Sequence, residues 1–417
     1  MKRFNNLILA GVQEGYSDIH ISGDHPVVYR KNGKIVFGSH EGYSPEEIDA
    51  LCNALLEENE LEMLRTRLSV DFARSVAHIR IRVNIFCTSR GLSMAIRLLP
   101  GRIPNISDLN LYPDLKDYCT LESGLILVCG ATGSGKSSTI AALLSEINRH
   151  QKRHIITLED PVEYRFNSQK SYIEQRELGT HMHSFDQGLR DVLREDPDVI
   201  MVGELREPET IRLTLNAVES GHLVIASLHA TNSEDALYRM CNSFAPDAQD
   251  MVRTQVSSVL SLLVVQRLQY MEEAGFRVPI LSILKGTNSL KATIRDNRFA
   301  QIESILQTGR AEGMFTMEKY EQEYIKRRGR LTPPSISFKP SPESANSRLY
   351  RSPLVDPRVA GAVHDMPGIS RTPKRSPVPR ARVQPEPQLE PQPQPDRGCY
   401  VINDNSTMED VISELDK

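Results

Sequence analysis

The residues with the clearest chemistry form a glycine-rich loop at positions 130–137. They read Gly-Ala-Thr-Gly-Ser-Gly-Lys-Ser, which satisfies the phosphate-loop pattern G-x-x-x-x-G-K-[ST]. Such a loop needs glycine because its backbone N–H groups converge on a polyphosphate at φ angles that a Cβ disfavours. We expect the lysine to bind the β- and γ-phosphates and the serine after it to ligate Mg²⁺. The loop therefore predicts a binding site for ATP or GTP.

The sequence on both sides of this loop predicts the elements that must position it. The apolar run at 125–129 predicts a buried parallel strand, and apolar residues after the loop recur at helical spacing. A helix that begins at the loop adds partial positive charge where the phosphates bind. The residues that we expect to contact the nucleotide are Gly130, Thr132, Gly133, Ser134, Gly135, Lys136, Ser137 and Ser138.

Two further predicted strands end in carboxylates. The apolar run before Glu204 places that acid at a strand end, where it can reach a Mg²⁺ shell or polarise an attacking water. Residues 155–163 end in three acids, Glu159, Asp160 and Glu163. Acids near a triphosphate repel it unless a metal, an arginine or a transferred proton offsets their charge, so the cluster indicates a catalytic site. The alternative interpretation is that these acids are helix caps or solvated loop residues.

Residues 1–112 are predicted to form a small α/β domain. Residues 18–22 alternate as a strand, and the Asn-Gly pair at 32–33 between two short extended runs predicts a β-hairpin. Residues 46–68 are predicted to be helical.

A basic face is predicted on the sheet of this small domain. Residues 78–86 alternate strictly, with isoleucine and valine on one side and polar residues on the other. Together with the partner run at 92–98, this alternation puts Arg80, Arg82 and Arg97 on the polar side. Such a basic face requires an acidic partner.

Residues 113–330 are predicted to form an α/β domain in which strands alternate with helices, which indicates a mostly parallel sheet. Proline begins the predicted helix at 208–220, and glycine follows its end. The other elements predicted after the phosphate loop are strands at 154–158, 199–203 and 223–228 and a long helix at 248–267.

The C-terminal part of the chain has a different composition. Residues 331–397 hold 15 of the 25 prolines and almost no apolar periodicity, which predicts a disordered Pro-rich linker. Residues 398–417 are predicted to be a short acidic segment that can form a helix. A further partner is expected to bind this tail.

The overall composition excludes several classes of protein. The net charge of −4 gives no general attraction to nucleic acid, and the six cysteines include no C-x-x-C pair, so neither a zinc ribbon nor a disulfide framework is predicted. A reducing cytoplasm fits this cysteine usage. No apolar run approaches the roughly 18 to 20 residues of a transmembrane helix, so no membrane span is expected.

Five segments of the chain together carry a family pattern. They are residues 130–138, 158–164, 193–198, 202–206 and 221–229. In combination they resemble the secretion ATPase superfamily of type II secretion and type IV pili. Within it, the chain is most similar to the twitching-motility retraction ATPases, from about residue 1 to residue 330.

The resemblance implies a RecA-like ATPase domain with a mostly parallel sheet after a PAS-like α/β domain. It also implies a ring of six identical subunits, in which the small domain packs against the nucleotide site of the next subunit. The cofactors implied are ATP and Mg²⁺. Lys136 and Ser137 match the residues that bind phosphate and Mg²⁺, and Glu204 matches the Walker B acid at the metal.

The resemblance also implies roles for residues outside the phosphate loop. The three clustered acids match the Asp box, with Glu163 the candidate base, and two histidines match the His box. Two arginines match positions that reach the γ-phosphate side of the site, which we expect to be the site of a neighbouring subunit. These catalytic candidates are Glu159, Asp160, Glu163, His222, His229, Arg82 and Arg97.

Three features bear on the direction of pilus movement. Related extension and secretion ATPases usually carry a tetracysteine loop, whereas residues 269–277 contain no cysteine. Those proteins usually have an extra N-terminal domain, whereas the small domain here begins at residue 1. Both features favour the retraction branch. However, the Ala-Ile-Arg-Asn-Leu motif of retraction ATPases is altered to Ser-Leu-Lys-Ala-Thr at 289–293.

The sequence thus predicts a cytoplasmic ATPase, peripheral at the cytoplasmic face of the inner membrane, that drives type IV pilus retraction through a membrane platform protein. One alternative is an extension, secretion or accessory ATPase of the same superfamily. The other is a nucleotide-binding regulatory or scaffold subunit that hydrolyses ATP weakly. ATP turnover separates the last reading from the other two, because a scaffold binds nucleotide without multiple turnover.

Overall fold

The computed structural model describes residues 1–31, 33–38, 42–77, 79–99 and 101–333. The predicted Pro-rich linker beyond residue 333 and the acidic segment at 398–417 lie outside the described residues. The predicted domain boundary at residue 112 stays a prediction. Near it, Ile103, Ile106 and Leu111 belong to the hydrophobic core that also contains Ile140 of the phosphate-loop helix.

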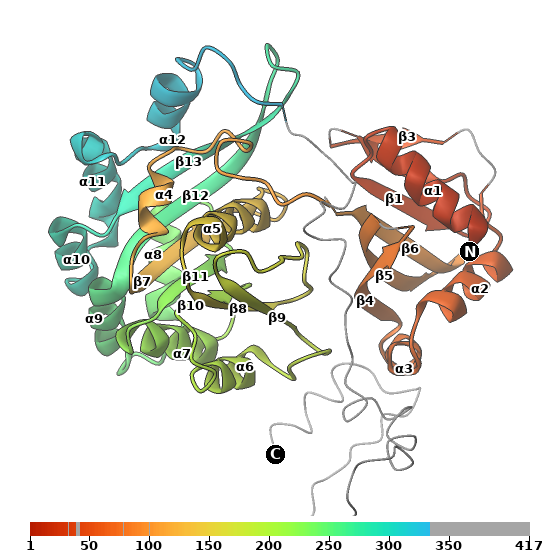
Figure 1. Cartoon of the computed structure of the whole chain (residues 1–417), viewed down its shortest axis with the longest axis horizontal. Helices are drawn as coiled ribbons and strands as arrows, with labels where there is room; N and C mark the ends of the chain where they lie inside the picture. The colour runs from red at the N-terminus through yellow and green to blue at the C-terminus, as the bar shows by residue number, and fades with distance from the viewer. Residues whose placement is uncertain (32, 39–41, 78, 100, 334–417) are drawn as a thin grey trace, which may run out of the picture. The chain divides into compact units, whose positions relative to one another are not determined.

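The N-terminal domain is built on a six-stranded antiparallel sheet with the order β3-β2-β1-β6-β5-β4 (Figure 1). The predicted hairpin is confirmed, because β2 and β3 pair on either side of Gly33, which has a φ of 81°. The strands are β1 (Asp18–Ser22), β2 (Val28–Lys31), β3 (Lys34–Phe37), β4 (Ser69–Val76), β5 (Ile79–Thr88) and β6 (Gly91–Leu98).

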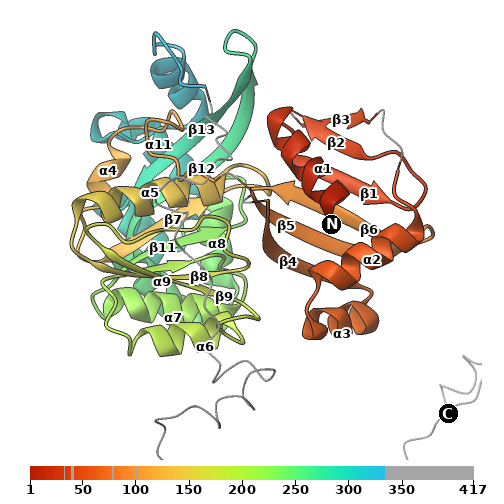
Figure 2. The same cartoon turned by 45° about the vertical axis from the view of Figure 1, so that its right-hand side comes forward.

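Three helices accompany this sheet, and α1 and α2 cover one of its faces (Figure 2). They are α1 (Lys2–Gln13), α2 (Pro45–Leu55) and α3 (Glu58–Arg67). The prediction of one helix over 46–68 is wrong at its centre. Leu56 adopts an extended conformation, and Glu57 begins α3 with a capping box in which its backbone N–H donates to the Glu60 carboxylate at 2.8 Å. Glu57 and Glu60, three residues apart, thus specify the start of a second helix. The spacing of the apolar residues alone does not reveal this start.

The second domain contains a seven-stranded sheet with the order β13-β12-β7-β11-β10-β8-β9. All neighbouring strands are parallel except β12 and β13, which form an antiparallel pair. The predicted strands at 154–158, 199–203 and 223–228 are confirmed. The strands are β7 (Gly124–Cys129), β8 (His154–Glu159), β9 (Tyr172–Glu177), β10 (Val199–Val202), β11 (Leu223–Leu228), β12 (Leu260–Met271) and β13 (Phe276–Lys285).

Helices cover both faces of the second sheet, with α5 on one face and α7 and α9 on the other (Figure 1). Each face has its own buried hydrophobic cluster, which is why the central strands are apolar throughout. The α-helices are α4 (Leu115–Tyr118), α5 (Lys136–His150), α6 (Phe185–Val192), α7 (Pro208–Glu219), α8 (Ser233–Asn242), α9 (Gln249–Val259), α10 (Asn288–Arg295), α11 (Ile302–Thr308) and α12 (Met317–Lys319). Short helices of other types follow α10, α11 and α12 at Phe299–Gln301, Gly309–Glu312 and Tyr320–Ile325.

The predicted long helix over 248–267 is wrong in its second half. Helix α9 ends at Val259, and the chain continues directly as β12, which lies between β7 and β13. Residues 260–265 are almost all apolar, so they fit a buried helix and a buried strand equally well. Pairing with β13, the next strand in the chain, and with the distant β7 decides for the strand.

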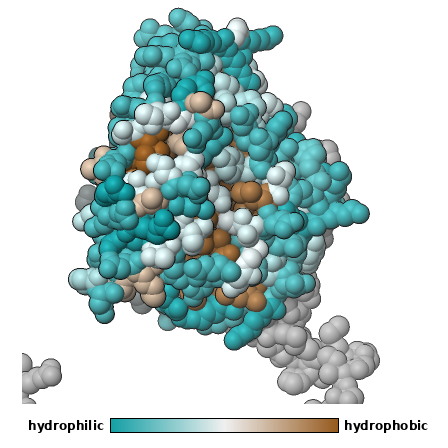
Figure 3. Space-filling model, turned by 90° about the vertical axis from the view of Figure 1, so that its left-hand side faces the viewer, coloured by the Kyte–Doolittle hydropathy of each residue, from teal (hydrophilic) through white to brown (hydrophobic). Residues whose placement is uncertain are grey.

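The altered motif at 289–293 lies on α10, among helices whose side of the molecule is mainly hydrophilic with separate hydrophobic patches (Figure 3). Its apolar residue Leu290 and the following Ile294 are fully buried in the core. Lys291 instead reaches the carbonyl oxygen of Ser258 at the end of α9, at 3.5 Å. The hydrophobic part of the motif therefore serves packing in this chain.

Candidate active site

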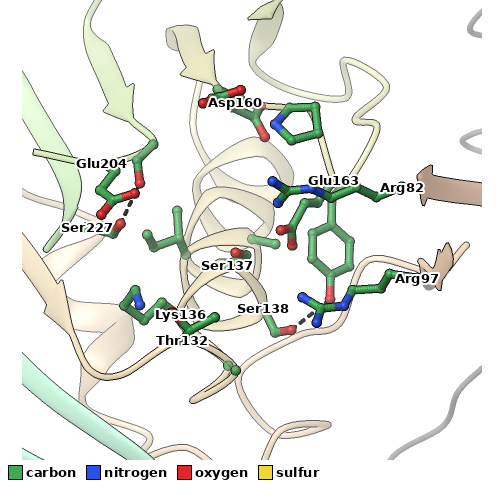
Figure 4. Close-up of a pocket in the computed structure, with 18 of the residues that line it drawn as sticks. Arg82, Arg97, Thr132, Lys136, Ser137, Ser138, Asp160, Glu163, Glu204 and Ser227 are labelled. Carbon is green, nitrogen blue, oxygen red and sulfur yellow. Dashed lines mark hydrogen bonds between the residues drawn. The ribbon is translucent and has the colours of Figure 1, made fainter. Parts of the chain in front are cut away.

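A cavity of about 570 Å³ lies at the carboxyl ends of β8 and β10 and is lined by residues of both domains (Figure 4). The second domain contributes the phosphate loop, the acid cluster and the end of β10, and the N-terminal domain contributes Arg82 and Arg97. Cavities at this edge of a parallel sheet are the usual ligand sites of open α/β folds. Most predicted site residues therefore meet at one place.

Six of the eight predicted nucleotide-contacting residues line this cavity: Thr132, Gly133, Gly135, Lys136, Ser137 and Ser138. The other two shape the loop from behind. Gly130 has a φ of 150°, and a Cβ there would lie 2.4 Å from the carbonyl oxygen of Gln266. Ser134 is buried, and its carbonyl oxygen accepts a hydrogen bond from the Gln266 side chain. Gly130 and Ser134 thus support the loop, and the prediction that they contact the nucleotide stays a prediction.

Gln266 on β12 is a site residue that the sequence analysis missed. Its Nε2 donates to the carbonyl oxygen of Ser134 at 2.7 Å, and its Oε1 accepts from Thr139 at 2.6 Å. The side chain is only 3% exposed, so it fixes the phosphate loop against β12. A single amide at the end of the apolar run 260–265 was the signal that could have identified it.

Lys136 is anchored within the loop that carries it. Its Nζ donates to the carbonyl oxygens of Gly130 at 2.8 Å and Ala131 at 3.2 Å. Burial lowers the pKa of Lys136, while the carboxylate of Glu204 opposes that shift. The ammonium group is therefore held at the cavity, where it can exchange carbonyl oxygens for phosphate oxygens.

Glu204 follows β10 and lies in a small polar network. Its carboxylate pairs with Nε2 of His229 at 3.1 Å and with the Arg206 guanidinium at 2.5 Å. The Ser227 hydroxyl donates to the carbonyl oxygen of Gly203, which links the ends of β10 and β11 (Figure 4). This network holds the acid on the cavity wall that also carries Lys136 and Ser137.

The two predicted histidines do not come together. His229 follows β11 and lines the cavity, whereas His222 precedes β11 and does not. The six residues of β11 separate the two positions by roughly 20 Å, since a strand rises about 3.3 Å per residue. Nδ1 of His222 is instead 2.7 Å from the carbonyl oxygen of Ala217 on α7. We therefore withdraw His222 from the catalytic set and assign it to the packing of α7 on β11.

All three clustered acids line the cavity, but their environments differ. Glu159 is buried and accepts hydrogen bonds from Thr157 at 2.6 Å and Gln175 at 2.9 Å. Burial raises the pKa of Glu159 to about 7, although the two hydrogen bonds lower it. Burial also raises the pKa of Asp160, and Arg82 opposes that shift. Glu163 projects into the same space as Ser137 (Figure 4).

The raised pKa of Glu159 predicts a pH dependence of stability. Its pKa shifts from 4.5 to about 7 on folding, so the stability that the protonated acid gives is present below pH 4.5 and is lost as the pH rises towards 7. Relative to Glu159→Gln, the wild-type free energy of unfolding should fall by about 3 kcal/mol across this range. Urea unfolding at a series of pH values measures the difference. An equal difference at pH 5 and pH 8 would contradict the shift.

The two cavity arginines, Arg82 and Arg97, are each held by an acid of their own domain. Arg82 donates from Nε and Nη2 to Asp71, at 3.1 and 2.6 Å, and this contact raises its pKa. Nε of Arg97 donates to Asp18 at 2.9 Å. Both side chains point into the cavity of the same chain (Figure 4). The expectation that they serve a neighbouring subunit's site stays a prediction, and within one chain the two arginines line the cavity that contains their own phosphate loop.

Over the described part of the chain, no three or more histidine, cysteine, aspartate or glutamate residues form a group that could hold a metal ion by themselves. A metal at this site would thus depend on nucleotide oxygens as well as on Ser137 and Glu204, which line the same cavity. The helices of the described residues also include none that is long and apolar enough to cross a bilayer.

A family model for "Type II/IV secretion system protein" matches residues 2–328. The chain belongs to this family. One similar member is the uncharacterized protein YggR of Escherichia coli, which is 39% identical over 76% of the chain and 97% of its own length. Another is the type IV pilus retraction ATPase PilT of Pseudomonas aeruginosa, which is 35% identical over 75% of the chain and 91% of its own length.

A solved structure supports the same fold for this secretion-system family member. The crystal structure of the pilus retraction motor PilT with bound ADP superposes with a TM-score of 0.70, at 35% sequence identity. It covers 81% of the chain and 96% of the PilT chain. The predicted fold, a RecA-like ATPase domain after a small α/β domain, is thereby confirmed.

Proposed function

We propose that the chain is an ATP-hydrolysing motor that drives type IV pilus retraction. The observation that carries this proposal is the convergence of the phosphate loop, Glu204 and the two cavity arginines on one cavity. The nucleotide class comes from the PilT relative, whose structure contains ADP. The retraction activity comes from relatives named for pilus retraction and twitching motility.

The predicted site residues that line the cavity each have a place in phosphoryl transfer. The loop N–H groups and Lys136 bind the β- and γ-phosphates, and Ser137 and Glu204 would hold Mg²⁺. When bound, that ion supplies positive charge that neutralises the phosphate oxygens. Glu163 accepts a proton from the attacking water, and the cavity arginines stabilise negative charge on the transferred phosphoryl group.

The assembly and the location are part of the proposal. We infer a homohexamer that acts at the cytoplasmic face of the inner membrane on a pilus platform protein. Such an arrangement would convert domain movement into rotation or displacement of the platform. The Pro-rich tail would bind a further partner, because its composition is typical of segments that bind partners without a hydrophobic core of their own.

The proposal is tested by two measurements that separate the candidate functions. Purified protein should hydrolyse ATP over many turnovers, whereas a scaffold subunit should bind nucleotide without multiple turnover. Deletion of the gene should leave cells with excess surface pili and no twitching. Loss of pili would indicate an extension ATPase instead, an outcome to consider because the motif on α10 is altered.

A further inference from the structure

Arg80 joins the two domains of one chain. It lies on β5, two residues before Arg82 and therefore on the same face of the sheet. Its Nη2 donates to the carbonyl oxygen of Val162 at 3.3 Å and lies 3.4 Å from the carboxylate of Glu177. Both acceptors belong to the second domain. One guanidinium thus ties the strand that carries Arg82 to the loop that carries the acid cluster.

Glu177 completes the contact from the other side. It ends β9, its side chain is 12% exposed, and its Oε2 accepts the backbone N–H of Val162 at 3.0 Å. Arg80 and Glu177 therefore hold the carbonyl and the amide of the same residue, Val162. That residue directly precedes Glu163, so its backbone sets where the Glu163 side chain begins.

The environment of Arg80 argues for a geometric role. The residue is 8% exposed, and burial lowers the pKa of its guanidinium to about 10. Within the described ranges its Nε has no hydrogen-bond acceptor. A buried ion pair with an unsatisfied donor gives little net stability, because desolvation offsets the attraction. Stabilisation of the fold therefore does not explain why a charge is buried at this junction.

We propose that Arg80 is a positioning residue that, together with Glu177, fixes the spacing between Arg82 and Glu163 across the cavity. Arg80 does not line the cavity, whereas Arg82 and Glu163 do, so Arg80 acts through them. The inference rests on the proposed ATPase function. A displacement of about 1 Å at a reacting centre can cost on the order of 10²-fold in rate, so a rigid link between the two groups matters.

The test compares purified full-length variants by steady-state and single-turnover ATP hydrolysis. Arg80→Ala and Glu177→Gln should each lower kcat by about 10- to 100-fold and leave the KM for ATP within about twofold, because neither touches the phosphate loop. Arg80→Lys should restore part of the rate. The matched control is Arg74→Ala, which breaks a 2.7 Å ion pair with Glu60 inside the N-terminal domain and should keep wild-type kcat.

The decisive measurement is the effect of Arg80→Ala in an Arg82→Ala background. A positioning role predicts a smaller further loss there than in the wild-type background, because one of the two groups whose spacing Arg80 fixes is already absent. A full multiplicative loss, a changed KM with unchanged kcat, or an equal loss in Arg74→Ala would overturn the inference. If Arg80→Ala does not fold, the isosteric Glu177→Gln replaces it, and its effect is measured with and without Arg82→Ala. Absence of turnover in the wild type would instead defeat the proposed function.

Discussion

Glu204→Gln should bind ATP with nearly wild-type affinity but turn it over at least about 10²-fold more slowly, the scale expected for a lost catalytic acid or base. The amide keeps the size of the side chain and removes the charge that faces Lys136 and His229. Lys136→Ala should instead lose most of its ATP affinity, because the ammonium group meets the phosphates directly. Equilibrium binding of a fluorescent ATP analogue and steady-state hydrolysis measure the two effects separately.

The matched control for this experiment is Glu207→Gln. Glu207 lies three residues further along the chain, is exposed, and is not among the residues that line the cavity. The same substitution there should leave turnover unchanged. If Glu204→Gln hydrolyses ATP at a nearly wild-type rate, Glu204 is not the catalytic carboxylate.

Loss of both cavity arginines should lower turnover by about 10³-fold or more, the range measured for arginines that stabilise phosphoryl transfer. We expect this contribution to be made within one chain, because Arg82 and Arg97 line the cavity that contains their own Lys136. Rings mixed from the arginine double mutant and Lys136→Ala should therefore stay inactive. Every site in such a ring lacks either the arginines or the lysine.

Restored activity in mixed rings would show that the arginines act on the neighbouring subunit, as the sequence led us to expect. Mixed assembly must be demonstrated with two distinguishable tags before an inactive mixture is interpreted. Arg90→Ala serves as the control, because Arg90 is exposed on the same domain and does not line the cavity. It should keep wild-type turnover.

Local patterns in the sequence predicted the elements that position the nucleotide. The phosphate loop, the Asn-Gly hairpin and the strands that end at Glu159 and before Glu204 each depend on residues that are close in the chain. A short range of residues fixes the backbone in these cases. The same patterns could not predict Gln266, whose role depends on β12 lying beside the loop.

Apart from the break between α2 and α3, which a local capping box sets, the deciding contacts in these cases are long-range. Residues 260–265 become a strand because β7 and β13 offer hydrogen bonds on both sides. His222 is removed from the site by the length of β11, which separates it from His229. Whether Arg82 serves its own chain depends on how two domains meet, as at the contact of Arg80 with Val162, and sequence spacing carries no such information.

The acid partners of the cavity arginines have a consequence for the release of product. Asp71 and Asp18 hold Arg82 and Arg97 from within the N-terminal domain, so a phosphate group must compete with a carboxylate for each guanidinium. After hydrolysis, we expect the two carboxylates to pair with the arginines again. Inorganic phosphate would then lose two cationic partners, which would favour its release from the cavity.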